Sequence, residues 1–244
     1  MREITYKEAI TEALKQSMKK DKSIFVYGAG VDDAEGIFGT GVGLSKYFGK
    51  QRVMDVPVSE NALTGIGIGS AITGMKPVLV HQRIDFTLLT LDQIVNHASK
   101  YRYMYGGKVS VPIVIRAIIG RGWGQGSQHS QSFHSLFAHF PGLKVVLPSN
   151  AYDAKGLLIQ SIIDKNPTIF IEHKFLMNNK EKVPEKFYSV KLGKGRKILK
   201  GKDVTLVCFS LMVEEAIKAA NILKKNKINC EVIDLRTSFP LDEK

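Results

Sequence analysis

The sequence has little of several features that would narrow its function class. Its 244 residues include two cysteines, Cys208 and Cys230, without CxxC or His–Cys spacing, so we expect neither a metal site nor any chemistry from them. No apolar run approaches the roughly 20 residues that cross a bilayer, and the opening residues MREITYKEAITEAL carry charges where a signal peptide is apolar. We therefore expect a cytoplasmic protein that is not bound to a membrane.

Acidic residues are scarce relative to basic ones, with 23 Asp and Glu against 35 Lys and Arg, which gives a formal net charge of +12. The basic residues concentrate between Lys174 and Lys202, among glycines and prolines, rather than along one amphipathic helix. No zinc-finger spacing or RNA-binding aromatic signature accompanies them, so we do not expect nucleic-acid binding. This stretch is typical of a solvated connector, and a docking surface for an acidic partner stays open.

Apolar strands that alternate with helices fill most of the chain. An amphipathic helix is predicted over residues 5–20, and further helices over 88–105 and 151–164. Strands that are apolar throughout imply a parallel sheet covered on both faces, which is an α/β fold. The strands are predicted at residues 23–28, 53–56, 77–81, 111–116, 144–148 and 168–172.

A second, smaller unit follows the basic stretch, with strands predicted at 204–209 and 230–235 and a helix at 213–225. One βαβ unit of this size buries too little surface to be stable alone. We therefore expect either that the chain is truncated or that this unit packs on a partner.

The stretch from Arg52 to Met75 is the centre of the sequence. A strand runs into Pro57 and Ser59, which favour a strand-to-helix corner, and Glu60 then lies in the first helical turn. The following glycines lower helix stability but let another backbone, a subunit or a ligand come close. A surface acid that complements the helix dipole, followed by tight core packing, is the alternative interpretation. Gly65, Gly67 and Gly69 form the pattern GxGxG. This pattern is not the dinucleotide-binding GxGxxG, so it predicts no nucleotide-phosphate loop.

Residues 120–132, GRGWGQGSQHSQS, follow neither the helical nor the strand period and are predicted to form a loop. Their Gly, Gln, Ser and His content is typical of active-site loops that need adaptable hydrogen bonds.

Four segments together resemble a known family. VPVSENALTGIGIGSAITGMKPV, LDQIVNHASKYRYMYGG, VPIVIR and QHSQSFHSLFAHFPGLKVVLPSNAYDAKGLL resemble the β subunit of the thiamine-diphosphate-dependent E1 components of 2-oxo acid dehydrogenases, within the transketolase-like superfamily. The resemblance covers essentially the whole chain, and SE, DQxxNxxxK and QHSQ in this order are specific. It implies a three-layer αβα pyrimidine-binding domain over residues 1–178, a basic connector over 179–202, and an incomplete transketolase C-terminal-like domain over 203–244.

The resemblance also implies a cofactor and a partner. Thiamine diphosphate would bind by its pyrimidine end, and an α2β2 assembly would form with an α subunit. The family's diphosphate and Mg²⁺ site carries a GDG motif that this sequence lacks, so the partner subunit is expected to bind Mg²⁺. The acyl group formed from a 2-oxo acid would pass to lipoamide on an E2 component.

Site residues follow from the matched motifs. Glu60 matches the carboxyl group at N1′ of the pyrimidine, where it activates the cofactor's own amino group by acid–base catalysis. Val58 would contact the cofactor, Phe86 would stack on the pyrimidine, and His129 would line the substrate channel, where a histidine can donate to the carbonyl oxygen. Phe86 as an ordinary core residue is the alternative. His134 and His139, on the apolar segment after QHSQ, are expected to be structural.

A potassium site is a further implication of the family. Asp164 and Asn166 fit equally well as the turn that ends a helix before Pro167, so both interpretations stay open. The residues that match a monovalent-cation site in some members are Ile113, Ser161, Ile162, Asp164 and Asn166.

The sequence departs from the family pattern in two places. Ala29 and Gly30 stand where many members carry an acidic pair, and His81, Gln82 and Arg83 replace positions that are usually apolar or aromatic. Arg83 and His81 are therefore candidate substrate residues, with Arg83 placed to receive an anionic group.

Two rival functions stay open from the sequence. The C-terminal half of a split transketolase would share the glutamate but transfer ketol groups between sugars. A non-catalytic assembly partner would keep the fold and dock other proteins through the basic connector.

Overall fold

A seven-stranded sheet forms the centre of the main domain, in a computed structural model that describes residues 1–33, 38–122 and 124–243. The strand order is β12-β6-β7-β5-β4-β2-β3, with β12 antiparallel to β6 and every other neighbouring pair parallel. The parallel sheet predicted from the apolar strands is therefore confirmed. The strands are β2 (Ile24–Gly28), β3 (Val53–Asp55), β4 (Lys76–His81), β5 (Val114–Ile119), β6 (Lys144–Val146), β7 (Thr168–His173) and β12 (Thr237–Phe239).

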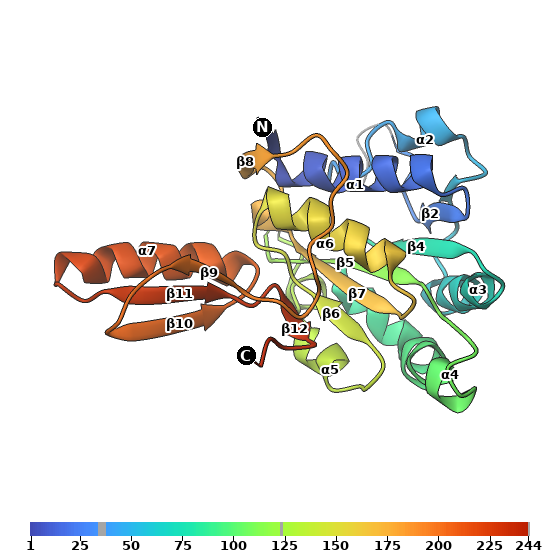
Figure 1. Cartoon of the computed structure of the whole chain (residues 1–244). Coiled ribbons are helices and arrows are strands. Elements are labelled where there is room, and N and C mark those ends of the chain that lie inside the picture. Colours follow the sequence, from blue (N-terminus) through green and yellow to red (C-terminus); the bar gives the residue numbers. More distant parts are fainter. Residues whose placement is uncertain (34–37, 123, 244) are drawn as a thin grey trace.

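Helices cover both faces of this sheet, so the domain has three layers (Figure 1). On β5, Val114 and Ile118 pack into the core beneath α1 (Tyr6–Lys20) and α6 (Ala151–Ile163), while Ile115 and Ala117 pack into the core on the other face. This alternation is the period of two that a strand imposes on its side chains. The other face is covered by α3 (Glu60–Ile72), α4 (Ser99–Met104) and α5 (His134–Ala138).

Local sequence explains where α1 begins. The side chain of Thr5 accepts a hydrogen bond from the backbone N–H of Glu8, and the Glu8 carboxylate accepts one from the backbone N–H of Thr5 at 2.7 Å. This reciprocal capping box satisfies two backbone donors at the start of the helix. A further short helix, α2 (Leu44–Phe48), lies in the glycine-rich segment before β3.

Two predicted elements differ from the structure. The helix expected over 88–105 starts earlier and changes its winding, from a 3₁₀ segment η1 (Ile84–Thr90) through a π segment η2 (Gln93–Ala98) into α4. The strand expected over 111–116 is β5 at Val114–Ile119, because Pro112 has no N–H to give to a sheet ladder.

The basic stretch contains more structure than a plain connector. After a 3₁₀ turn η4 (Lys174–Leu176), β8 (Lys180–Val183) pairs antiparallel with β1 (Arg2–Thr5). Farther on, β9 (Arg196–Leu199) joins the second sheet, so the solvated character expected over 179–202 holds only for part of the stretch.

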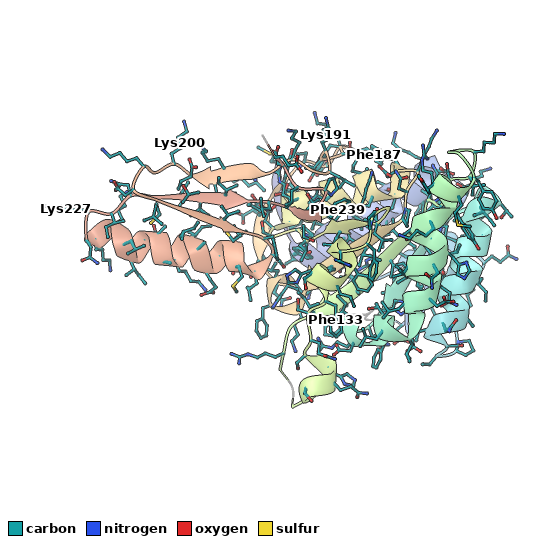
Figure 2. All side chains as sticks on the ribbon, turned by 90° about the horizontal axis from the view of Figure 1, so that it is seen from below. Phe133, Phe187, Lys191, Lys200, Lys227 and Phe239 are labelled. Atoms are coloured by element: carbon teal, nitrogen blue, oxygen red, sulfur yellow. The ribbon has the colours of Figure 1, made fainter. Side chains whose placement is uncertain are left out.

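The second unit is a three-stranded sheet in the order β10-β11-β9, with β10 (Val204–Cys208) parallel to β11 (Cys230–Asp234) and α7 (Leu211–Lys225) packed on it. It extends away from the main domain (Figure 1), and Figure 2 places Lys200 and Lys227 on its far part and Phe239 at the junction. Among the described residues, no helix is long and apolar enough to cross a bilayer.

Candidate functional site

A cavity of about 270 Å³ opens where β2 and β4 end, beside the first turn of α3. The carboxyl ends of parallel strands are where α/β folds bind ligands. Five residues singled out from the sequence, Val58, Glu60, His81, Phe86 and His129, line this one cavity. Its other lining residues are Ala29, Ser59, Leu63, Val80 and Gln82.

Glu60 is the first residue of α3, as the sequence predicted. Ser59 directly precedes the helix, at the corner predicted from the sequence, but its side chain makes no capping hydrogen bond. The turn is instead fixed from the sheet, because the hydroxyl of Tyr27 on β2 donates to the carbonyl oxygen of Leu63 at 2.9 Å. Tyr27 is 2% exposed, and burial raises the pKa of its hydroxyl, which stays a proton donor. Glu60 itself is half-buried at the edge of the cavity.

Phe86 and His129 meet across the cavity from different parts of the chain. Phe86 lies in η1 and His129 at the end of the 3₁₀ turn η3 (Ser127–His129) in the glycine-rich loop. Their ring centroids are 5.2 Å apart and the ring planes are nearly perpendicular, at 89°. An edge-to-face contact of this kind fixes the relative position of two rings.

His81 stands at the end of β4 and is 4% exposed. Burial lowers the pKa of its imidazole to about 4, so the ring is neutral at physiological pH. Its Nε2 atom is buried and has no hydrogen-bond partner among the described residues. A buried polar atom without a partner costs free energy, so this nitrogen is a point at which a bound group gains a hydrogen bond.

Arg83 does not line the cavity. Its side chain is 2% exposed and donates from one amino group to the carbonyl oxygen of Gly120 at 2.7 Å and from the other to the side chain of Gln125. The role in recognising an anionic substrate group, which the sequence suggested, has no geometric support at this cavity. Gln82 lines it instead and donates to the carbonyl oxygen of Ala29 at 3.1 Å.

The residues expected at a potassium site gather where α6 ends and where β5 and β7 begin. The carboxylate of Asp164 accepts from the backbone N–H and side-chain amide of Asn166, at 2.9 and 2.8 Å, and forms an ion pair with Lys144. The carbonyl oxygen of Ile113 accepts from the backbone N–H of Thr168 at 2.9 Å. This is the helix-ending turn of the alternative interpretation, and Lys144 supplies the positive charge beside Asp164. Ser161 and Ile162 are buried on α6.

Other candidate residues lie elsewhere. His134 packs its ring against Phe209 at 4.9 Å and His139 against Phe140 at 5.4 Å. Cys208 and Cys230 are free thiols. Groups of three or more His, Cys, Asp or Glu arranged to hold a metal ion are absent from the described part of the chain.

The cavity fits one end of thiamine diphosphate. A flat aminopyrimidine needs an aromatic wall and a carboxyl group, which Phe86 and Glu60 supply, and the unpartnered Nε2 of His81 adds a polar contact. The cavity is smaller than the roughly 300–1,000 Å³ of complete ligand pockets, and Val58 on its rim is 75% exposed. The described residues therefore line a small pocket that is open at this rim.

Two residues of this region, Asp85 and Gln131, were not singled out from the sequence as site residues. Asp85 in η1 accepts a hydrogen bond at 2.8 Å from the side chain of Gln131, the last residue of the QHSQ motif. The motif gave Gln131 a visible signal, whereas Asp85 had none, because its partner lies 46 residues away.

The comparisons with known proteins agree on the family. The family described as Transketolase, pyrimidine binding domain matches residues 2–180, and Transketolase, C-terminal domain matches residues 193–244. The β subunit of acetoin:2,6-dichlorophenolindophenol oxidoreductase from Cupriavidus necator is 45% identical over 250 residues, covering 99% of this chain and 74% of the relative. The pyruvate dehydrogenase E1 component subunit beta of Rickettsia bellii is 40% identical over 240 residues, covering 98% and 74%.

The fold also matches a solved structure titled as a split gene transketolase in an inactive beta4 tetramer. The TM-score is 0.80 at 21% identity, over 98% of this chain and 73% of that one, a likeness of fold alone. The three-layer fold, the matched domains and the relatives at 40–45% identity lead to one conclusion. The chain belongs to the transketolase-like family, in the group of the β subunits of thiamine-diphosphate-dependent E1 enzymes.

Proposed function

We propose that the chain is the β subunit of an E1 enzyme that decarboxylates a 2-oxo acid and transfers the acyl group, with lipoamide on an E2 component as acceptor. The observation that carries the proposal is the meeting of Glu60, Phe86, His81 and His129 around one cavity at the carboxyl ends of parallel strands. Bound thiamine diphosphate would supply a nucleophilic carbon for attack on the 2-oxo group.

Five residues that line the cavity each have a role in this proposal. Glu60 exchanges a proton with the pyrimidine ring nitrogen N1′, Phe86 holds the flat ring, and Val58 covers it from the rim. His129 donates a hydrogen bond or proton toward the substrate, since a histidine serves this purpose near neutral pH. His81, which is neutral, offers a hydrogen bond without adding charge to the cavity.

A partner subunit completes the site in this proposal. The outer side of α3 exposes Ile66 at 59% and Ile72 at 46%, and an added methyl group at Gly69 between them would meet nothing within 4 Å. An exposed face with small and apolar residues beside an incomplete cavity suits a close subunit contact. We assign this face to an α subunit in an α2β2 assembly, which would also bind the diphosphate and Mg²⁺ through a GDG motif.

The potassium site stays a prediction. The turn at Asp164 satisfies its own hydrogen bonds, and a potassium ion bound there would have to share that carboxylate with Lys144.

Several substrates must be compared as acyl or ketol donors. The relative named for acetoin is 45% identical to this chain and the relative named for pyruvate is 40% identical, so identity does not decide between them. The rival function as half of a split transketolase is less well supported, since the matched structure of that title is 21% identical. A panel of pyruvate, branched 2-oxo acids, acetoin and a ketose phosphate separates these donors.

The decisive experiment replaces Glu60→Gln in the chain assembled with a GDG-bearing partner. We expect the rate of 2-oxo acid decarboxylation, followed with dichlorophenolindophenol as electron acceptor, to fall by about 10²–10⁴-fold, the range for loss of a general acid–base group. Binding of thiamine diphosphate, measured by calorimetry, should remain, because Gln keeps the size of Glu. Glu3→Gln, an exposed acid on β1, is the matched control and should leave both measurements unchanged. A Glu60→Gln enzyme within twofold of the wild-type rate would instead favour the non-catalytic assembly partner.

A further inference from the structure

The segment Arg83–Phe86 follows β4 and lies beneath the loop that carries His129. Arg83 is 2% exposed and Asp85 6% exposed, and Ile84 between them is completely buried in the core. The segment is therefore firmly attached to the main domain. Its two charged side chains, Arg83 and Asp85, form hydrogen bonds to the loop.

Arg83 holds the first part of the loop. Its guanidinium donates to the carbonyl oxygen of Gly120, the residue directly after β5, at 2.7 Å, and to the side-chain oxygen of Gln125. The guanidinium also lies 5.3 Å from the ring centroid of Phe38. Two contacts five residues apart fix the path of the chain as it leaves the sheet, because a guanidinium donates in a rigid planar geometry.

Asp85 holds the last part of the loop. Its Oδ1 atom accepts from the side-chain amide of Gln131 at 2.8 Å and lies 3.4 Å from the backbone N–H of the same residue. Gln131 is two residues after His129. Phe86, the next residue of the segment, packs edge to face with His129 itself.

The loop has little internal structure to hold its own shape. Glycines with positive φ stand at positions 120, 122, 124 and 126, and glycine backbones lose the most conformational entropy on ordering. Within the described part of the loop, the 3₁₀ turn of η3 and a bond of 2.7 Å from the Ser130 hydroxyl to the Gly126 carbonyl oxygen give local order. Contacts from outside must therefore supply the rest.

We propose that Arg83 and Asp85 are positioning residues, which fix the two arms of the loop so that His129 faces the cofactor cavity. The inference rests on the proposed function for the role of His129, whereas the anchoring itself does not. This role of Arg83 differs from substrate recognition, because its guanidinium donates hydrogen bonds to Gly120 and Gln125 of the loop. A displacement of about 1 Å in a catalytic group can lower a rate about 10²-fold, so anchoring matters even for residues that touch no substrate.

The test uses two kinds of variant. Asp85→Leu and Arg83→Met remove the anchors, while Asp85→Asn keeps an acceptor oxygen for Gln131. Gln131→Ala and Gln125→Ala remove the same contacts from the loop side and are expected to fold, because Gln131 is exposed and Gln125 half-buried. Thr87→Val is the matched control, since Thr87 is completely buried in the same 3₁₀ segment but its hydroxyl bonds to Ile84 and not to the loop.

Hydrogen exchange of the amides at 120–131 is the first readout and needs no activity. We expect exchange to rise about tenfold or more in Asp85→Leu, Arg83→Met and the two glutamine variants, and to stay at the wild-type rate in Asp85→Asn and Thr87→Val. Equal exchange in Gln131→Ala and wild type would overturn the inference, even if the Glu60 experiment supports the proposed function.

Steady-state kinetics of the assembled enzyme is the second readout. The anchor variants should lose about 10- to 100-fold in kcat with KM for the 2-oxo acid changed less than about threefold, and Asp85→Asn should recover most of the loss. A kcat within twofold of wild type in Asp85→Leu, with a loosened loop, would also overturn the positioning role. If Glu60→Gln is fully active while exchange responds as expected, only the proposed function fails.

Discussion

The guanidinium of Arg116 on β5 donates two hydrogen bonds to the carboxylate of Glu172 on the neighbouring strand β7, at 2.6 and 2.9 Å. Both side chains are buried, with 1% and 0% of their surfaces exposed, and a third donation from Arg116 reaches the hydroxyl of Thr40 at 2.8 Å. The pair therefore stands as a buried, hydrogen-bonded ion pair on the sheet face that α1 and α6 cover.

Replacing one partner of this pair should destabilise the protein more than replacing both partners. Glu172→Leu leaves a buried positive charge without its partner, so we expect a loss of about 3–5 kcal/mol in the free energy of unfolding. The double variant Arg116→Met with Glu172→Leu replaces both charges by apolar groups and should lose at least about 1 kcal/mol less than Glu172→Leu alone. Urea denaturation of the three proteins measures these differences. Equal losses for the single and double variants would show that packing, not charge, dominates.

Two glycines of α3 should respond in opposite directions to the same substitution. A Cβ atom at Gly67 would overlap the hydroxyl of Tyr27 and lie 2.8 Å from Cδ1 of Ile113, so Gly67→Ala should cost about 1–3 kcal/mol. Gly69→Ala meets nothing within 4 Å and should raise stability by up to about 1 kcal/mol through helix propensity.

Assembly provides the second part of this comparison. If the outer face of α3 contacts the α subunit, Gly69→Ala should weaken the complex although it stabilises the isolated chain. Sedimentation of mixed subunits measures this effect, and an undiminished affinity would place the subunit contact elsewhere.

The pH dependence of stability should carry a contribution from Asp234. Burial raises the pKa of this carboxyl to about 6, although the hydroxyl of Ser149 donates to it at 2.5 Å. The folded protein then binds the proton more tightly than the unfolded chain, so the stability from this group is complete below about pH 4 and is lost as pH rises through 6. The difference between wild type and Asp234→Asn should therefore change by about 2 kcal/mol between pH 4 and pH 7. A difference independent of pH would contradict the raised pKa.

Ser210, directly before α7, has φ 54° and ψ −137°, a backbone conformation that side chains other than glycine rarely adopt. Its hydroxyl is buried and has no partner among the described residues, so removing it loses no described hydrogen bond. Ser210→Gly should thus raise the free energy of unfolding by about 1 kcal/mol, despite the greater entropy of glycine in the unfolded chain. Ser189→Gly, at an exposed position outside the positive-φ region, is the control and should be neutral or slightly destabilising.

Much of the main domain could be predicted from the sequence because its signals are local. The apolar runs of β4 and β7 and the amphipathic pattern of α1 each lie within a few consecutive residues. Glu60 could be placed at the start of a helix for the same reason, since Pro57 ends the preceding strand before it.

The remaining features depend on contacts between distant residues. Strands β1 and β8 are short and carry alternating charges, and they exist because they pair with each other across the sequence. The sequence suggested that Arg83 binds an anionic substrate group. In the structure its guanidinium donates instead to the carbonyl oxygen of Gly120, which is 37 residues away. Sequence reasoning therefore finds the acid and the histidine that line the cavity, and misses the contacts between distant residues around them.

Strand β12 belongs to the second unit by sequence and to the first by hydrogen bonding, through its antiparallel pairing with β6 and the bond of 2.8 Å from the Leu147 N–H to the Arg236 carbonyl oxygen. The two units are consequently joined by backbone hydrogen bonds as well as by the connecting chain. A protease that cuts between residues 184 and 195 should leave two fragments that migrate as one particle under native conditions and separate only in denaturant.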